Sequence, residues 1–271
     1  MKYFGGYMEK KLLNKNIVIT GASSGIGEKV AILTAELGAR PILLARSTEK
    51  LKKICEIIKQ KTERECIYYT LDVSDFEQVK VVFNKIYEDV GQIDILLNNA
   101  GFGVFESLQE ASFDEIKQMF EVNVLGLIAC TKEVIPYMLE NNSGHIINIA
   151  SQAGKVGSAK SSGYSATKHA VLGFTNSLRL ELFQTNIVIS AVNPGPIETN
   201  FFSKADKSGN YVKNAKKFML KSDFVAEQIV KLMIYPKREL NLPKWMNTAS
   251  IFYHIFPGFL DKLLGKTFNM K

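Results

Sequence analysis

Short apolar runs alternate with longer segments of helical period between Asn16 and Asn193. The short runs are rich in β-branched residues and leucine, and the longer segments repeat apolar residues three and four positions apart. The predicted strands are Asn16–Thr20, Pro41–Ala45, Cys66–Leu71, Ile93–Asn98, His145–Ala150 and Ile187–Val192. The predicted helices are Glu28–Leu37, Glu49–Lys61, Phe76–Val90, Phe113–Glu140 and Tyr164–Phe183.

Strands that alternate with crossover helices predict an α/β fold with a doubly wound, mainly parallel, Rossmann-like sheet. The chain has 271 residues and no Gly/Ser linker, which suits a single domain over residues 14–237. We expect an N-terminal extension over residues 1–13 and a C-terminal extension over residues 238–271. Arg238–Pro243 is a short candidate for a seventh strand.

The net charge of +7 is confined to the C-terminal quarter of the chain. Residues 201–271 hold 13 lysines and arginines against 5 acidic residues, whereas residues 1–200 are nearly neutral. No nucleic-acid recognition motif precedes residue 201, so we predict no nucleic-acid partner. The aromatic and lysine-containing segment from Trp245 onward, which Pro257 interrupts, leaves two alternatives. A helix pair that packs on the pocket or on a neighbouring subunit is favoured over an interfacial membrane anchor.

The cysteines, histidines and N-terminal residues give no sign of a metal site or a secretory signal. Cys55, Cys66 and Cys130 show no CxxC or histidine spacing, so we predict buried, reduced thiols and a cytoplasmic location, with peripheral membrane contact as an alternative. The first 16 residues lack the apolar core of a signal peptide. His145, His169 and His254 form no metal-ligand pattern, so no metal is expected.

Three glycines follow the first predicted strand and precede a helix, in the order Thr20-Gly21-Ala22-Ser23-Ser24-Gly25-Ile26-Gly27. Gly21 permits a tight exit from the strand, Gly25 lets backbone N–H groups approach a phosphate, and Gly27 permits close helix–strand packing. A glycine-rich turn alone is usually only structural. Its position after the first strand favours a dinucleotide site.

The glycine spacing is similar to that of the short-chain dehydrogenase/reductase superfamily, and further motifs of that family follow in order. They are Asn98-Asn99-Ala100-Gly101 at the end of the fourth strand, Asn123 in the next helix, Ser151 after the fifth strand, Tyr164 and Lys168 on the following helix, and Pro194-Gly195 with Thr199 after the sixth strand. The resemblance covers about residues 14–200.

The resemblance implies a cofactor site at the ends of these strands. Its residues would be Gly21, Ser23, Ser24, Gly25, Ile26, Gly27, Arg46, Ser47, Asp72, Val73, Asn99, Ala100, Gly101, Tyr164, Lys168, Pro194, Gly195, Ile197 and Thr199. No acidic residue ends the second strand, and Arg46 offers a fork of donors suited to a 2′-phosphate. We therefore predict that NADP(H) is preferred, with NAD(H) not excluded. The alternative for Arg46 is a solvated residue at a helix start, and for Asp72 a helix cap.

Tyr164 and Lys168 lie four residues apart, so their side chains project from one face of a helix. A lysine can stabilise a phenolate and so allow tyrosine to act as an acid or base. By resemblance, Ser151 would orient the substrate oxygen, and Asn123 would open its helix and hold a water near Lys168. Each residue alone has an ordinary structural explanation; their order along the chain favours catalysis.

The family implies an oxidoreductase that moves hydride between NADP(H) and a carbonyl or alcohol. The alternative is a dinucleotide-binding sensor or scaffold with little turnover. Relatives place a substrate lid at about residues 196–220, here with a mobile-looking polar stretch, Ser203–Lys217. Apolar residues flank it and follow Gly101, which indicates a hydrophobic substrate: Phe102, Val104, Phe105, Phe201, Phe202, Phe218 and Met219. Relatives pair through the two long helices, so a homodimer or homotetramer is expected.

Overall fold

The computed structural model describes residues 11–64, 66–206 and 209–268. Most of the predicted N-terminal extension, residues 1–10, lies outside them, but Leu12 is buried in the core. Elements of the first half are β1 (Asn16–Thr20), α2 (Gly25–Glu36), β2 (Arg40–Ala45), α3 (Thr48–Thr62), β3 (Ile67–Thr70), α4 (Phe76–Val90), β4 (Ile95–Asn98), α5 (Phe113–Phe120), the π-helical turn η1 (Glu121–Gly126) and α6 (Leu127–Glu140).

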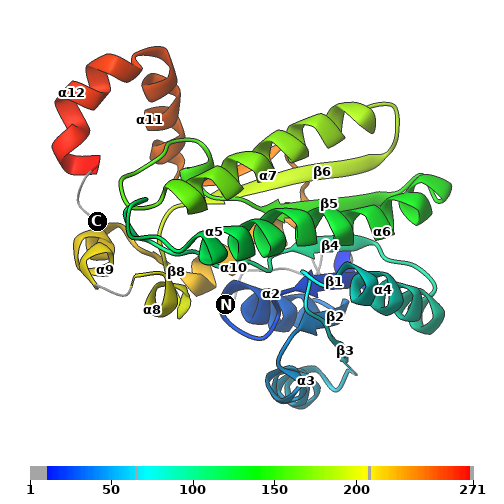
Figure 1. Cartoon of the computed structure of the whole chain (residues 1–271). Coiled ribbons are helices and arrows are strands. Elements are labelled where there is room, and N and C mark those ends of the chain that lie inside the picture. Colours follow the sequence, from blue (N-terminus) through cyan, green and yellow to red (C-terminus); the bar gives the residue numbers. More distant parts are fainter. Residues whose placement is uncertain (1–10, 65, 207–208, 269–271) are drawn as a thin grey trace.

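The second half continues the alternation and ends in a pair of helices. Its elements are β5 (Gly144–Ile149), the 3₁₀ turn η2 (Gln152–Gly154), α7 (Ser162–Glu181), β6 (Ile187–Pro194), β7 (Ile197–Glu198), α8 (Phe201–Ala205), α9 (Asn210–Ala215), the 3₁₀ turn η3 (Lys216–Phe218), β8 (Leu220–Lys221), α10 (Ser222–Ile234), β9 (Glu239–Leu242), α11 (Lys244–Ile255) and α12 (Pro257–Phe268). Figure 1 shows α11 and α12 projecting from one end of the molecule.

Seven parallel strands form the sheet in the order β3-β2-β1-β4-β5-β6-β9. Successive residues of a strand face opposite sides, so Ile17 and Ile19 pack with α2, α3 and α10. Val18 packs on the other face with α4, α6 and α7. Helices therefore cover both faces (Figure 1), as the doubly wound prediction required. The strand order reverses between β1 and β4, and ligands bind at such a point in open α/β sheets.

Most predicted elements are confirmed, with small shifts at their ends. β1 and α4 have the predicted bounds, whereas β3 and β4 begin one and two residues later than predicted. β9 confirms the seventh strand as the neighbour of β6. The predicted long helix Phe113–Glu140 is continuous but contains η1, and Pro136 is accommodated inside α6.

The prediction of three reduced thiols is wrong for two of them. Cys55 of α3 and Cys66, just before β3, form a disulfide, with their Cα atoms 5.1 Å apart. Cys130 is a free, buried thiol as predicted. The spacing of 11 residues matched no motif, but the crossover returns the chain from α3 to β3 and so brings the pair together. The predicted cytoplasmic location rested on three reduced thiols, and only Cys130 now supports it.

The polar stretch Ser203–Lys217 is more regular than predicted. It contains part of α8, all of α9 and the start of η3, while residues 207 and 208 lie outside the described part. Within the described residues, the one helix that is long and apolar enough to span a membrane is Phe113–Glu140. That helix packs on the sheet through α6, which contributes buried residues to the core, so its length and composition are weak evidence for a membrane span.

Candidate active site

The glycine turn after β1 leaves no room for side chains at two positions. A Cβ atom on Gly21 would lie 2.8 Å from the Cα of Ala100, and one on Gly27 would lie 2.6 Å from the carbonyl oxygen of Gly21. Gly21 also has a φ of +64°. Glycine is therefore required both for the turn and for the close approach of α2 to β1, as the sequence predicted.

The N-terminus of α2 has no side-chain cap. Ser24 occupies the N-cap position, but its side chain makes no capping hydrogen bond to the first turn. Gly25 has a φ of +62°, and its nearest neighbour beyond the turn is the Thr199 side chain, at 3.6 Å from a built Cβ. Backbone N–H groups and the helix dipole at this position suit a pyrophosphate. The residues present thus fit the phosphate part of a dinucleotide.

Asn99 fastens the glycine turn to the end of β4. Its side-chain amide donates to the carbonyl oxygens of Thr20 (2.9 Å) and Gly21 (3.1 Å). In return, the Thr20 hydroxyl accepts from the backbone N–H groups of Asn99 and Ala100, each at 3.0 Å. The Asn99 side chain is therefore bound to protein, and the segment from Asn99 to Gly101 lines the cavity.

Arg46 and Asp72 lie side by side in the part of the cavity where the resemblance would place an adenosine. Arg46 follows β2, its side chain is 74% exposed, and its Nη1 atom is 3.7 Å from Oδ2 of Asp72. The other oxygen of Asp72 accepts from the backbone and the hydroxyl of Ser74. The N-cap residue of α4 is Asp75, whose carboxylate accepts from the Gln78 N–H. The alternative that Asp72 caps this helix is therefore wrong. Ser47 and Val73 also line this part of the cavity.

Ser151, Tyr164 and Lys168 meet at the end of β5. Ser151 is the N-cap residue of η2, and its hydroxyl accepts from the N–H of Ala153 at 3.1 Å. Tyr164 and Lys168 lie one turn apart on α7, with Lys168 Nζ 5.8 Å from the centre of the Tyr164 ring. Lys168 Nζ also donates to the carbonyl oxygen of Ile149 at 2.8 Å. All three residues line the cavity.

Burial pushes Tyr164 and Lys168 toward their neutral forms. It raises the pKa of the Tyr164 phenol above its ordinary value, a hydrogen bond with Ser151 opposes the rise, and nearby Tyr211 adds to it. Burial also lowers the pKa of Lys168 to about 8. At neutral pH the phenol is thus held in the protonated form, which can donate a proton.

Asn123 lies in η1, where the helix widens as predicted for this residue. Its side chain pairs with the backbone of Phe102, accepting from the N–H at 2.9 Å and donating to the carbonyl at 2.8 Å. It also donates to the Thr167 hydroxyl at 3.2 Å. A Cβ on Gly101 would meet Asn123 at 3.0 Å and Lys168 Nζ at 3.8 Å. Asn123 therefore connects the segment after β4 to α7.

An aromatic cluster covers Tyr164 on the substrate side. The Phe105 ring lies 5.6 Å from Tyr164 and 5.1 Å from Tyr211, and the Phe201 ring lies 5.8 Å from Tyr164. The cavity that joins this cluster to the glycine turn has a volume of about 1220 Å³. Of the predicted apolar lining, Phe102, Phe105, Phe201, Phe202 and Phe218 line it, whereas Val104 and Met219 pack behind the cluster.

The favoured prediction of a C-terminal helix pair that packs on the pocket is confirmed for α11, but sequence reasoning named none of the lining residues that α11 and α9 contribute. Tyr211, Trp245, Met246 and Tyr253 line the cavity but belong to no motif. A signal for Met246 lies in Gly195, where a Cβ would stand 2.9 Å from the methionine sulfur. Four residues of the predicted cofactor site, Pro194, Gly195, Ile197 and Thr199, also line the cavity.

The histidines have structural partners. His145 is buried, its Nε2 lies 2.8 Å from the Ser190 hydroxyl, and burial lowers its pKa to about 4. His169 and His254 each pair with the backbone carbonyl four residues earlier in their helices. Among residues 11–64, 66–206 and 209–268, no group of histidine, cysteine and acidic side chains could hold a metal ion.

Comparisons with known proteins agree with these motifs. The family model described as short chain dehydrogenase matches residues 15–209. An uncharacterised oxidoreductase of Staphylococcus saprophyticus is 40% identical over 189 residues, 69% of this chain and 75% of the relative. The NADP-dependent 3-hydroxy acid dehydrogenase of Schizosaccharomyces pombe is 35% identical over 213 residues, 76% of this chain and 82% of the relative.

A solved structure agrees over the fold as well. The alcohol dehydrogenase of the archaeon Thermococcus sibiricus, complexed with 5-hydroxy-NADP, matches with a TM-score of 0.76 and 31% identity, over 84% of this chain and 95% of that one. Family model, sequence relatives and solved structure all point to the same group of enzymes. This chain therefore belongs to the short-chain dehydrogenase/reductase superfamily of oxidoreductases.

Proposed function

We propose that this protein is an NADP(H)-dependent oxidoreductase that interconverts a carbonyl and an alcohol on a hydrophobic substrate. One observation carries the proposal: Ser151, Tyr164 and Lys168 converge in a single cavity, between the glycine turn and the aromatic cluster. A cofactor groove on one side and an apolar pocket on the other leave the Tyr164 hydroxyl at their border. This is the position that a proton donor to a reacting carbonyl needs.

Arg46 supports the preference for NADP(H) over NAD(H). Its guanidinium is exposed at the end of β2, and no carboxylate follows that strand directly to repel a 2′-phosphate. Asp72 lies close enough to steady the side chain. The relative from Schizosaccharomyces pombe is named as NADP-dependent, and the Thermococcus structure contains a derivative of NADP, which agrees with this preference.

The mechanism follows from the residues around Tyr164. The bound nicotinamide supplies or accepts the hydride. In the direction of reduction, Tyr164 donates its proton to the carbonyl oxygen, while the Ser151 hydroxyl donates a hydrogen bond to the same oxygen as negative charge develops. The cationic form of Lys168 would stabilise the phenolate that remains, and by resemblance to the family it would also hold the nicotinamide ribose. Asn123 lies where the helix opens at η1, and the resemblance to the family implies a water there that would return the proton.

The aromatic cluster supports a hydrophobic substrate. Phe105, Phe201, Phe202 and Tyr211 contact one another around Tyr164, and Phe218 stacks edge-on against Trp245 farther out. Few fixed charges stand on this side of the cavity to bind an ionic substrate. The pocket thus favours an apolar group next to the reacting carbon.

Apolar side chains left uncovered on the two long helices support a homodimer or homotetramer. Phe113 at the start of α5 is 78% exposed, Phe183 just after α7 is 79% exposed, and Leu125, Leu139 and Leu180 also face solvent. Such apolar surface favours pairing with a second copy. Analytical ultracentrifugation tests this assembly, since Leu125→Glu should shift the protein toward monomer.

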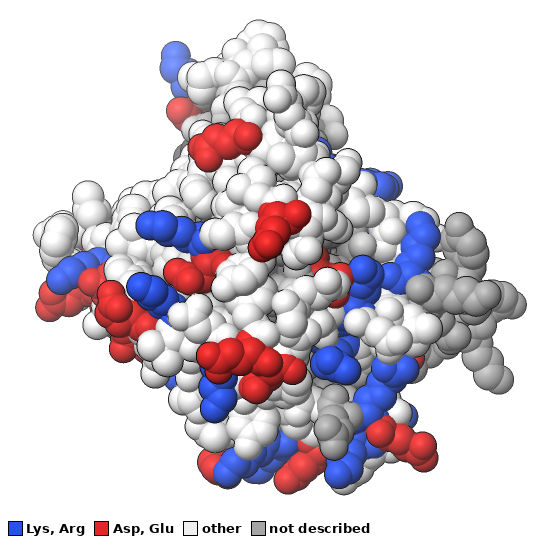
Figure 2. All heavy atoms as spheres, turned by 90° about the vertical axis from the view of Figure 1, so that its right-hand side faces the viewer, with Lys and Arg blue, Asp and Glu red and all other residues white. Residues whose placement is uncertain are grey.

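Exposed residues of α11 and α12 support a peripheral membrane contact. Ile251, Phe252, Ile255, Phe256 and Phe259 are each more than half exposed. Figure 2 shows few charged side chains at the top of the face drawn, the end of the molecule where α11 and α12 lie in Figure 1. Co-sedimentation with anionic vesicles should fall for Phe252→Ser/Phe256→Ser if this surface binds lipid.

A substrate panel tests the function. Purified protein is mixed with NADPH or NADH and with aliphatic aldehydes, ketones, β-ketoacyl thioesters, steroids or sugars, and cofactor absorbance is followed. We expect turnover with apolar carbonyls and a higher kcat/KM with NADPH. Tight NADPH binding without turnover across the panel would contradict an enzymatic role and support a sensor.

A further inference from the structure

The turn after β5 carries Ser151 at one end and Lys155 at the other. Ser151 is the N-cap and Lys155 the C-cap residue of η2, which is only three residues long. A Cβ on Gly154 would lie 2.6 Å from the carbonyl oxygen of Lys168, so η2 packs directly on the backbone of α7. Gln152 also donates to the Asn193 carbonyl of β6 at 2.8 Å. A change in the position of Lys155 would therefore shift the short segment that carries Ser151.

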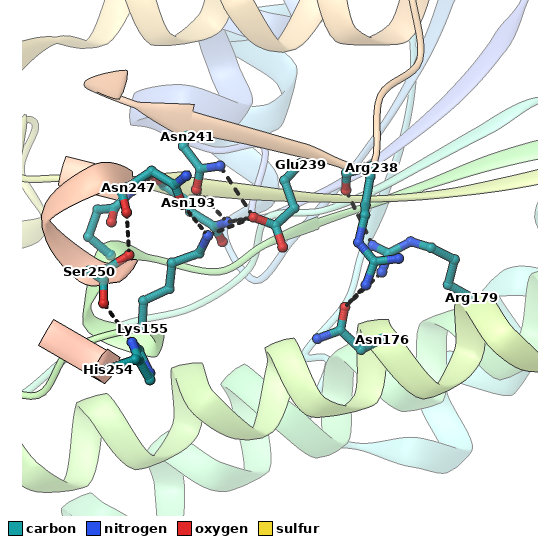
Figure 3. A network of polar contacts seen from close by, with 11 residues as sticks. Lys155, Asn176, Arg179, Asn193, Arg238, Glu239, Asn241, Asn247, Ser250 and His254 are labelled. Carbon is teal, nitrogen blue, oxygen red and sulfur yellow. Dashed lines mark hydrogen bonds and ion pairs between the residues drawn. The ribbon is translucent and has the colours of Figure 1, made fainter. Parts of the chain in front are cut away.

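Lys155 is the centre of a partly buried polar network between this turn, β9 and α11 (Figure 3). Its Nζ donates to Oε2 of Glu239 and to Oδ1 of Asn247, each at 2.6 Å. Asn193 and Asn241 donate to the same Glu239 oxygen at 3.3 and 3.2 Å. The Lys155 and Glu239 side chains are only 15% and 25% exposed, so water screens the pair weakly.

Glu239 is held as an anion by this network. Burial would raise its pKa, but hydrogen bonds from Lys155 and Asn241, together with the positive charges of Lys155 and Arg238, lower it below its ordinary value. Arg179 of α7 separately donates to the backbone carbonyl of Arg238, which fixes the start of β9 (Figure 3). The Lys155–Glu239 ion pair thus joins the turn after β5 to a strand, β9, whose start is held in place by Arg179.

Helix α11 has little else to hold it in place. Ser250 is its one fully buried residue, and Trp245, Ile251, Phe252 and Ile255 are each more than half exposed. Yet Trp245, Met246 and Ala249 of this helix line the substrate side of the cavity. The position of this wall depends on a small number of contacts, among which the Lys155–Asn247 hydrogen bond joins α11 to the catalytic turn.

We propose that Lys155 is a positioning residue that, through Glu239 and Asn247, holds the α11 wall against the turn carrying Ser151 and so creates a distal apolar subsite. The subsite binds the part of the substrate farthest from the reacting carbon, an extended aliphatic chain. This inference rests on the proposed function. Lys155 touches neither the cofactor groove nor the Tyr164 hydroxyl, and it acts on substrate selection through α11.

The test uses Lys155→Met in the full chain, because methionine keeps the length and removes the charge. Trp245 is the single tryptophan of the protein, so its fluorescence reports on α11 directly. We expect a red-shifted emission, stronger quenching by acrylamide and weaker energy transfer to bound NADPH, with an unchanged NADPH Kd. Lys80→Met, at an exposed lysine of α4, is the matched control and should change none of these.

Kinetics supply the second measurement, with NADPH and a series of straight-chain aliphatic aldehydes of increasing length. For Lys155→Met we expect kcat/KM to fall about tenfold with the longest aldehyde and less than about twofold with the shortest, mainly through KM. An equal loss at all lengths, or an unchanged length profile, would overturn the proposal. If the unmodified protein turns over none of them, the proposed function fails, while the Trp245 spectra still test the coupling.

Two more variants distinguish the effect of losing this polar network from the effect of a general loss of stability. Asn247→Ala removes only the contact to α11 and should reproduce the fluorescence change and the length profile, even where Lys155→Met folds poorly. Glu239→Gln should give a smaller change of the same kind, and the double variant with Lys155→Met should be no worse than Lys155→Met alone. Additive effects, or a silent Asn247→Ala, would show that these residues do not act as one unit.

Discussion

The two halves of the cavity are built in different ways. The cofactor half consists of backbone at the ends of β1, β4 and β6, brought close by glycines and fastened by Asn99 and Thr20. The substrate half consists of large side chains, such as Phe105, Phe201 and Trp245, that come from three separate segments. Backbone shape constrains the sequence locally, whereas a lining of large apolar residues can be supplied from many positions.

This difference explains why the class of function can be inferred from the family match while the substrate cannot. The cofactor half lies within residues 15–209, which the family model matches. The α11 wall lies outside that range and is held by the Lys155 network. We therefore expect changes in the cofactor half to alter cofactor affinity, and changes in the substrate half to alter selectivity.

Tyr164→Phe should give the largest effect, because Tyr164 stands at the border of the two halves. Loss of the phenol removes the proton donor, so kcat should fall by about 10²–10⁴-fold. The NADPH Kd, measured by fluorescence titration, should change little. Tyr211→Phe makes the same chemical change deeper in the substrate half and should cost far less. Comparable losses in the two variants would argue against Tyr164 as the donor.

Arg46→Asp should reverse the cofactor preference. It removes the donors for a 2′-phosphate and adds a carboxylate that repels it, so the ratio of kcat/KM for NADPH to that for NADH should fall by about 10²-fold. Arg40, exposed at the opposite end of β2, offers the control Arg40→Asp. A ratio that stays the same for Arg46→Asp would exclude a 2′-phosphate contact.

The glycine turn and the spacing of Tyr164 and Lys168 were predictable from the sequence because their requirements are steric and local. Gly21 and Gly27 have no space for a Cβ, and Tyr164 and Lys168 need one helical turn between them. Even the widening of the helix at Asn123 followed from the resemblance. What the sequence did not show was that the Asn99 side chain is engaged by the glycine turn.

The substrate half and the disulfide depend on contacts between distant segments. Tyr211 and Trp245 have no spacing relative to Tyr164 that marks them as pocket residues. Cys55 and Cys66 meet only because α3 turns back toward β3. The Lys155–Glu239 pair spans 84 residues, and a lysine and a glutamate so far apart carry no local signal. Tertiary packing decides such contacts.

Lys168→Met, at the border of the two halves, should raise the stability of the protein at neutral pH while it abolishes turnover. The folded pKa of Lys168, about 8, lies below its unfolded value, so the unfolded chain binds more protons between pH 8 and 10.5. The free energy of unfolding of cofactor-free protein therefore rises with pH across this window. Below pH 8 the buried charge is destabilising, so Lys168→Met should raise stability by about 1–3 kcal/mol at pH 7.

Urea unfolding from pH 7 to 10 measures this change. The gain from Lys168→Met should shrink as the pH rises, because the wild-type lysine becomes neutral, while turnover is lost at every pH. Lys80→Met should leave the pH dependence unaltered, since its side chain is exposed in the folded protein. A variant that is less stable than wild type at pH 7 would mean that the bond to the Ile149 carbonyl outweighs the burial of charge.

Gly25→Ala gives the smallest expected effect. It tests whether the cofactor half binds the pyrophosphate through backbone N–H groups that a side chain would obstruct. Gly25 and Gly91 both have positive φ, +62° and +76°, so alanine strains each by about 1–2 kcal/mol. A Cβ on Gly91 meets nothing within 4 Å, whereas one on Gly25 stands at the start of α2 beside Thr199. Both variants should lose similar stability in urea, but only Gly25→Ala should raise the NADPH Kd, by about tenfold. Equal Kd values for the two would place the pyrophosphate away from the α2 N-terminus, and the cofactor half would then depend on side chains as much as the substrate half does.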